Sequence, residues 1–227
     1  MQTGTMPAES ITWFDVVEIY DQARVEIRSS VDPISLQASA GRKAEFRREL
    51  GAAVQQASRG IFTHDVEVTL TWYISESRRY QTHLVADLDN VMKPILDAVT
   101  GPDGILIDDN QIQSVKACWM TPGARGTGFD LTFEALMRDD FIEREGLTFV
   151  EFSANRCYPL PGLSVPGHEA SFVNSWRIAL ARYQSLLEAG VDHGSAQSVL
   201  PLVRPFPRAR LGRFMVRHES EFSEDGP

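Results

Sequence analysis

The sequence ADLDNVMKPILDAVTGPDGILIDDNQI, residues 86–112, predicts a helix and an apolar strand joined by a tight turn. Apolar residues recur there at helical spacing, at Met92, Ile95, Leu96 and Val99. We therefore expect a helix over 90–99 that ends at the glycine- and proline-containing link 101–104. The short apolar run 105–107 is typical of a buried strand, and it is followed by two acids. The segment thus predicts part of a sheet domain in which acids border both elements.

Periodic stretches on either side extend this unit to one domain. We expect a helix at 42–58 and strands at 11–19, 24–30, 65–74, 105–107, 113–120 and 128–136. Strands interleaved with helices predict an α/β (α+β) fold class, with a mixed β-sheet and two helices.

The pattern changes after residue 138. A possible strand at 147–152 is followed by a proline- and glycine-rich stretch, 158–167, that predicts a loop. An amphipathic helix is expected at 172–189, which makes this extension mainly helical. We therefore divide the chain into an N-terminal strand or extension at 1–23, a domain at 24–138 and a C-terminal extension at 139–227.

The composition excludes several classes of protein. The 227 residues have an ordinary globular balance, with 43% hydrophobic and 23% charged residues, which excludes a fully disordered or fibrous chain. No apolar run is long enough to span a membrane, and the N-terminus does not resemble a secretory signal. The two cysteines, Cys118 and Cys157, are expected to be reduced and buried. We therefore expect a cytoplasmic protein without a membrane partner.

The charge pattern is ambiguous about nucleic acid. A net charge of −9 argues mildly against such a partner, because phosphate binding normally leaves a basic footprint. Five arginines and no acid nevertheless lie in 203–218, which we call the arginine strip. The strip could follow a nucleic-acid backbone. A solvated or dimer-facing surface is an equal alternative.

The acids of 86–112 predict a metal site. Asp87 and Asp89 lie two residues apart before the helix, so both side chains project to one side if the backbone is extended. Lys93 follows one helical turn later, and the strand ends at Asp108 and Asp109, of which alternation lets only one join the first pair. Clustered carboxylates need a counter-cation to remain ionised, and such hard oxygen ligands suit Mg²⁺ or Mn²⁺. The alternatives are helix caps, solvated turns and a surface ion pair of Lys93.

The run DLDNVMKPILDAV, followed by ILIDDNQI, resembles the signature of RusA-type Holliday junction resolvases, the crossover junction endodeoxyribonucleases. In that family an Asp-x-Asp-Asn, a Lys four residues after the second Asp, and a later Asp-Asp-x-Gln form one Mg²⁺-dependent active site. The resemblance implies that Asp87, Asp89 and Asp109 are catalytic metal ligands and that Lys93 is the catalytic cation. It also implies Mg²⁺ as cofactor, with Mn²⁺ as a possible substitute, and a homodimer acting on branched DNA.

The expected function is therefore a Mg²⁺-dependent, structure-selective DNA endonuclease that resolves Holliday junctions or other branched DNA by phosphodiester hydrolysis. One alternative is a catalytically weak or inactive RusA-like protein for DNA binding or assembly, and another is a less selective metal-dependent nuclease. The candidate DNA-binding residues are Arg47, Arg48, Arg78, Arg79, Arg208, Arg210 and Arg213.

Overall fold

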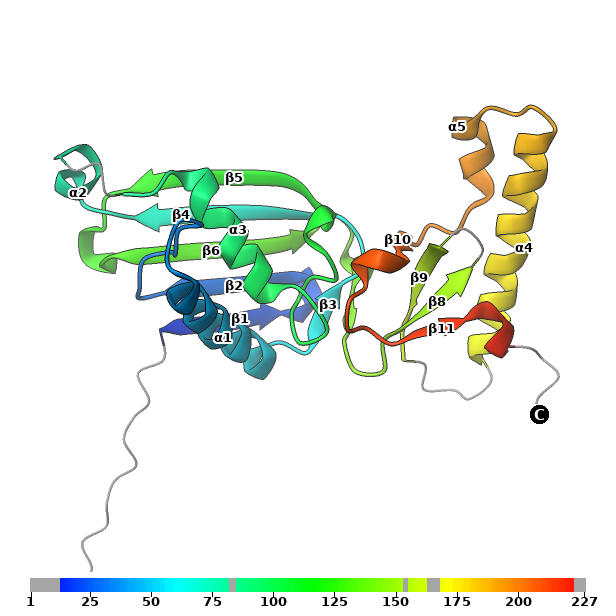
Figure 1. Ribbon diagram of the computed structural model, residues 1–227, viewed down its shortest axis with the longest axis horizontal. Helices are drawn as coiled ribbons and strands as arrows, with labels where there is room; N and C mark the ends of the chain where they lie inside the picture. Colours follow the sequence, from blue (N-terminus) through cyan, green and yellow to red (C-terminus); the bar gives the residue numbers. More distant parts are fainter. Residues whose placement is uncertain (1–12, 82–84, 153–154, 163–167, 223–227) are drawn as a thin grey trace, which may run out of the picture.

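The computed structural model describes residues 13–81, 85–152, 155–162 and 168–222. It contains a five-stranded sheet with helices on one face and, beside it, a smaller unit built on a four-stranded sheet and a long helix (Figure 1). The predicted α/β class is therefore confirmed. The expected strand at 11–19 begins in residues outside the described ranges.

The large sheet has the strand order β1-β2-β6-β4-β5. Its strands are β1 (Phe14–Ile19), β2 (Arg24–Ser29), β4 (Val66–Tyr73), β5 (Ile112–Met120) and β6 (Gly128–Ala135). Neighbouring strands are antiparallel except β4 and β5, which run parallel. Because β4 and β5 are parallel, the residues that precede each of them meet at the same end of the sheet. The loop 108–111, which we call the acidic loop, lies at this end, directly before β5.

One face of the sheet is buried beneath two helices. In β4 every second residue is buried, at Val66, Val68, Leu70 and Trp72, whereas the residues between them are exposed or half-buried. This alternation is the mark of a strand with one face in the core. The helices α1 (Ala40–Ala57) and α3 (Leu88–Val99) lie on that face (Figure 1), and the short α2 (Glu76–Gln81) lies beyond the end of β4.

Helix α3 contains a proline that ties it to the loop before α1. Pro94 has no backbone N–H, so the carbonyl of Asn90, four residues earlier, has no partner within the helix. That carbonyl accepts a hydrogen bond of 2.8 Å from Leu36 N. The carbonyl that Pro94 leaves free within the helix thus makes a tertiary hydrogen bond, which holds α3 against the loop before α1.

The C-terminal unit combines a sheet with helices. Its strands are β8 (Thr148–Phe152), β9 (Arg156–Leu160), β10 (Phe206–Pro207) and β11 (Val216–His218), in the order β10-β9-β8-β11. Helix α4 (His168–Glu188) packs against this sheet, and α5 (His193–Ala196) follows it. The strands β3 (Gly60–Phe62) and β7 (Phe141–Glu143) form a separate antiparallel pair.

Three expectations about these elements need correction. Residues 105–107 form no strand, because only Leu106 makes isolated bridges, to Phe62 and Thr100. The loop expected from residue 158 is wrong over 158–160, which belong to β9. The long helix of the extension is confirmed, but a four-stranded sheet accompanies it, and the arginine strip supplies two of the strands. These strands have two or three residues each, too short for a periodic pattern to show.

The expected domain boundaries are crossed by strand pairing. Strand β1 precedes the boundary at residue 24 but pairs with β2, and β7 follows the boundary at 138 but pairs with β3. The division at 24 and 138 stays a prediction.

The arginine strip contributes to a hydrophobic core. Phe206, Leu211 and Phe214 are buried in a cluster that also contains Ile61 and Ile107 of the large-sheet unit. The strip therefore connects the two units, and its backbone is not a free surface.

The described helices include none that is long and apolar enough to span a membrane.

The two cysteines differ in accessibility. Cys157 is fully buried, and burial raises the pKa of its thiol to about 11, whereas Cys118 is only half-buried, which corrects the expectation that both are buried. Because the thiolate is the reactive form, we expect one thiol per chain to react with a disulfide reagent at pH 8 and the second only after unfolding. The Cys118→Ser variant should leave no rapidly reacting thiol. Rapid reaction of Cys157 in that variant would contradict the buried placement.

Candidate active site

The site is built on one face of α3. Asp89, Lys93 and Asp97 are spaced four residues apart, so they follow one another along a single side of the helix. Lys93 Nζ donates to Asp97 Oδ1 at 2.6 Å and to Asp109 Oδ2 at 2.5 Å. The structure thus brings together the predicted Lys93 and the predicted Asp109, which lie on separate elements.

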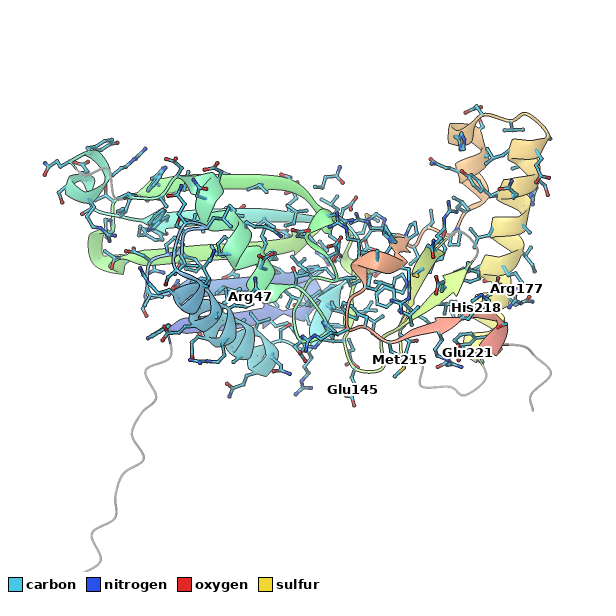
Figure 2. The ribbon with its side chains drawn as sticks, viewed as in Figure 1. Arg47, Glu145, Arg177, Met215, His218 and Glu221 are labelled. Atoms are coloured by element: carbon cyan, nitrogen blue, oxygen red, sulfur yellow. The ribbon has the colours of Figure 1, made fainter. Side chains whose placement is uncertain are left out.

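This contact is the centre of a longer network of opposite charges. On α1, Arg47 Nη2 contacts Asp97 Oδ2 at 3.1 Å, on the side of the helix that faces α3 (Figure 2). At the other end, Arg210 of the arginine strip lies 3.8 Å from Asp109 Oδ1 through its Nη1. Cations and carboxylates therefore alternate from α1 through α3 and the acidic loop to the C-terminal unit.

The network stabilises the charged forms of its members. Burial alone would lower the pKa of Lys93, but the hydrogen bonds to Asp109 and Asp97 outweigh it, and the pKa of Lys93 lies above its ordinary value. The hydrogen bond from Lys93 holds the pKa of Asp109 below its ordinary value, against the effect of burial. Both groups are therefore ionised at neutral pH.

A buried glutamine fixes the loop that carries Asp109. The Gln111 side chain is completely buried, and its Oε1 accepts hydrogen bonds from Ile107 N at 2.7 Å and Asp108 N at 3.0 Å. Its Nε2 donates to the carbonyls of Phe62 at 2.8 Å and His64 at 2.9 Å. One side chain therefore holds the backbone before Asp109 against the chain that leads into β4.

The Asp108 side chain is more buried than that of Asp109, although Arg210 contacts both. Burial, more than any other cause, raises the pKa of its carboxyl group, and Arg210 Nη1 lies 3.5 Å from its Oδ1. Its Oδ2 is buried and has no hydrogen-bond partner among the described residues. The two acids are therefore not separated onto opposite faces as alternation predicted, because 105–107 form no strand and the same Arg210 Nη1 also lies 3.8 Å from Asp109 Oδ1.

Asp87 and Asp89 lie at the start of α3 and are exposed. Asp87 occupies the N-cap position, but its side chain makes no capping hydrogen bond, and Asp89 Oδ1 accepts from Asn90 N at 2.9 Å. Between described residues, no hydrogen bond joins either acid to Asp109. Helical rise places Asp89 about 6 Å along the axis from Lys93, so one turn of helix separates the first pair of acids from the Lys93–Asp109 contact.

The donor chemistry fits a hard divalent cation, because all the candidate ligands are carboxylates. The unpartnered Oδ2 of Asp108 adds a further oxygen in this region. Within the ranges that the structure describes, however, no three Asp, Glu, His or Cys side chains lie close enough together to hold a metal ion. Asp109 instead belongs to an ion-pair network, in which Lys93 neutralises it.

The expected DNA-binding arginines have acidic or aromatic neighbours. Besides Arg47–Asp97 and Arg210 on the acidic loop, the contacts are Arg48–Glu49, Arg78–Asp32, Arg208–Glu151, Arg213–Asp103 and Arg79 over the Tyr80 and Trp119 rings. A polar cavity of 370 Å³ lies beside Arg78 and is also lined by Arg42 and by Ala86, next to Asp87. Arginines therefore lie near Asp87, at the start of α3, and near Asp109, in the acidic loop.

Sequence reasoning missed three residues that shape this site. Asp97 is not among the predicted site residues, although it shares Lys93 with Asp109. Arg204 contacts Asp65 Oδ1 at 2.7 Å and the Asn110 carbonyl at 2.9 Å, and so ties the acidic loop to the C-terminal unit. Gln111 is part of the quoted motif, but the partners of its amide lie 47 and 49 residues away, at a distance that no local pattern reveals.

Comparison with known protein families gives a match over the region that contains this site. The family model described as Endodeoxyribonuclease RusA matches residues 15–125, a range that begins within β1 and includes helix α3 and the loop 108–111. No curated protein matches the chain. The match begins before the expected domain start at 24 and ends before 138. Residues 15–125 of the chain are therefore similar to the endodeoxyribonuclease RusA family.

Proposed function

We propose that the protein is a divalent-metal-dependent endonuclease that hydrolyses phosphodiesters in Holliday junctions or other branched DNA. The family is one of endodeoxyribonucleases that act on branched DNA. The observation that supports the proposal most directly is the contact of Lys93 with Asp109, because it joins α3 and the acidic loop, the two halves of the RusA-like motif, into one site.

The proposed roles follow from charge and position. Asp87, Asp89 and Asp109 would supply oxygen ligands, and Mg²⁺ bound there, or Mn²⁺ in its place, would act as a Lewis acid on the phosphoryl oxygens. Lys93 would leave Asp109 and stabilise the negative charge that develops on the phosphate. Asp97 would hold the Lys93 ammonium at this position through its 2.6 Å contact.

The DNA backbone requires a cationic path to this acidic segment. Arg42 and Arg78 line the cavity next to Asp87, and Arg210 lies at the acidic loop. These side chains could neutralise phosphates on both sides of the cleaved bond. A two-fold dimer would present two such paths, one to each of two symmetric strands of a junction, and it forms part of the proposal, as does a cytoplasmic location.

A cleavage panel tests this function. The purified protein is incubated with labelled four-way junction, flap, duplex and single-stranded DNA, each with Mg²⁺ and with EDTA. We expect Mg²⁺-dependent cuts in the junction and little cleavage of duplex. Equal cleavage of all substrates would indicate a less selective nuclease, and binding without any cleavage would indicate a DNA-binding or assembly protein.

The Lys93→Ala variant separates chemistry from binding. We expect the single-turnover cleavage rate to fall by about 10²- to 10³-fold, because a charge-stabilising group at the reacting phosphate is lost. Junction affinity should change by only a few-fold, since one cation is a small part of a multi-phosphate footprint. Lys116→Ala, on an exposed position of β5, is the matched control and should behave like the wild type. A collapse of binding with a normal rate per bound complex would make Lys93 a phosphate contact only.

A further inference from the structure

The arginine strip places one side chain directly on the acidic loop. Arg210 ends the short 3-10 helix Arg208–Arg210, and the next residue, Leu211, is buried in the cluster that joins the two units. Its Nη1 lies 3.5 Å from Asp108 Oδ1 and 3.8 Å from Asp109 Oδ1. The backbone of Arg210 is therefore anchored by packing, and its guanidinium points to the acidic pair.

The contacts of Arg210 differ from those of a structural arginine. Strong charge-assisted hydrogen bonds are about 2.7–2.9 Å long. Arg204, from the same strip, meets this standard with its 2.7 Å contact to Asp65, and its side chain is only 19% exposed. Arg210 makes longer contacts through a single nitrogen, and 55% of its side chain remains exposed. Arg204 thus acts as a clamp, whereas the guanidinium of Arg210 is held in place but weakly engaged.

An anionic substrate would need a cation at this point. A phosphodiester that approaches Asp109 meets the negative charges of two neighbouring acids, and their repulsion increases as the distance shortens. Arginine presents five N–H donors in a planar fork that matches phosphate oxygens, and only Nη1 of Arg210 is used by the acids. Among the described residues, the remaining donors of Arg210 make no hydrogen bond, so they can pair with a phosphate without breaking a strong bond.

From these observations we propose that Arg210, supplied by a segment outside the family match, donates to the phosphate that is cleaved at Asp109. The proposal rests on the proposed nuclease function and extends its site to the C-terminal unit. It makes Arg210 a substrate-contacting residue, in distinction from Arg204, which positions the loop.

A chemical double-mutant cycle tests the contact without metal or cleavage. Junction binding is measured in EDTA for the wild type and Arg210→Ala, with natural DNA and with a methylphosphonate placed singly at each phosphate flanking the crossover. If the guanidinium touches one of these phosphates, the two changes should be coupled by about 5- to 10-fold in affinity at that phosphate. Arg28→Ala is the matched control, because Arg28 is 69% exposed, pairs with Asp130 and is not among the candidate DNA-binding residues. Its cycle should show no coupling.

Single-turnover cleavage in Mg²⁺ provides the second readout. Arg210→Ala should cut about 10²-fold more slowly at saturating protein, and Arg210→Lys, which keeps the charge but not the fork, should recover part of the rate. Thermal unfolding of each variant should stay close to that of the wild type, since Arg210 makes only long contacts.

Three results would overturn the proposal: no coupling at any phosphate, faster cleavage by Arg210→Ala, or a rate loss matched by a loss of folded protein. Failure of the wild type to cut any DNA would instead refute the proposed function, and the coupling in EDTA would still be measurable.

Discussion

Replacing Asp109 with Asn is expected to reduce junction cleavage by about 10³-fold, with junction binding unchanged or slightly tighter. Asp109 is the proposed metal ligand that also receives Lys93, so the change removes a charged ligand and releases the cation from its 2.5 Å contact. Binding should not suffer, because removal of a negative charge lowers repulsion of the phosphates. The measurements are single-turnover cleavage in Mg²⁺ and affinity in EDTA.

The matched control is Asp103→Asn. Asp103 is also a loop acid paired with an arginine, but it is exposed and its partner is Arg213, away from the Lys93 contact. This variant should cleave at the wild-type rate. The stability of Asp109→Asn should change little, since partly exposed ion pairs contribute little to folding. A variant at position 109 that cuts normally would show that the assigned site is wrong.

The Gln111→Leu variant is expected to lose about 3–5 kcal/mol of stability, although leucine has nearly the volume of glutamine. The change leaves two backbone N–H groups, of Ile107 and Asp108, and two carbonyls, of Phe62 and His64, without their hydrogen bonds in a buried site. The thermal midpoint should fall by about 10 °C. Hydrogen exchange should accelerate at the amides of Ile107 and Asp108, because the loop loses its internal tether.

Gln113→Leu is the control for this prediction. Gln113 lies two residues further on, at an exposed position of β5. The same replacement there should change the midpoint by no more than about 2 °C, since surface substitutions are usually near neutral. Equal effects at 111 and 113 would contradict the role assigned to the buried amide.

The sequence predicted the elements of the large sheet because their patterns are local. The alternation of apolar residues in β4 and their helical spacing in α3 can be recognised from neighbouring residues alone. The motif, through its resemblance to a known family, predicted Lys93 and Asp109 in one site; the structure places these two side chains in contact, and their catalytic roles stay predictions. The ligand roles of Asp87 and Asp89 stay predictions, because these acids lie a helical turn from the contact that the structure contains.

The contribution of the C-terminal unit could not be predicted in the same way. Arg204 and Arg210 reach the acidic loop only because Phe206, Leu211 and Phe214 are buried between the two units. This packing depends on shape and on strands of two or three residues, which leave no periodic signal. The absence of acids within the strip suggested an exposed basic surface. The acids that pair with Arg204 and Arg210 lie 139 and 102 residues away in the sequence, so a local charge count does not include them.

The clamp of Arg204 on Asn110 also has a consequence for the order of biosynthesis. These two residues are separated by 94 positions, and the strip that contains Arg204 follows the whole of the large sheet. On the ribosome, the N-terminal sheet can begin to fold while the strip is still untranslated, since chains emerge and fold from the N-terminus. The loop with Asp108 and Asp109 then lacks both arginines and the core around Phe206. A nascent or prematurely terminated chain would thus carry its carboxylates without the contacts that fix them, so correct assembly of the acidic loop depends on translation having passed residue 214.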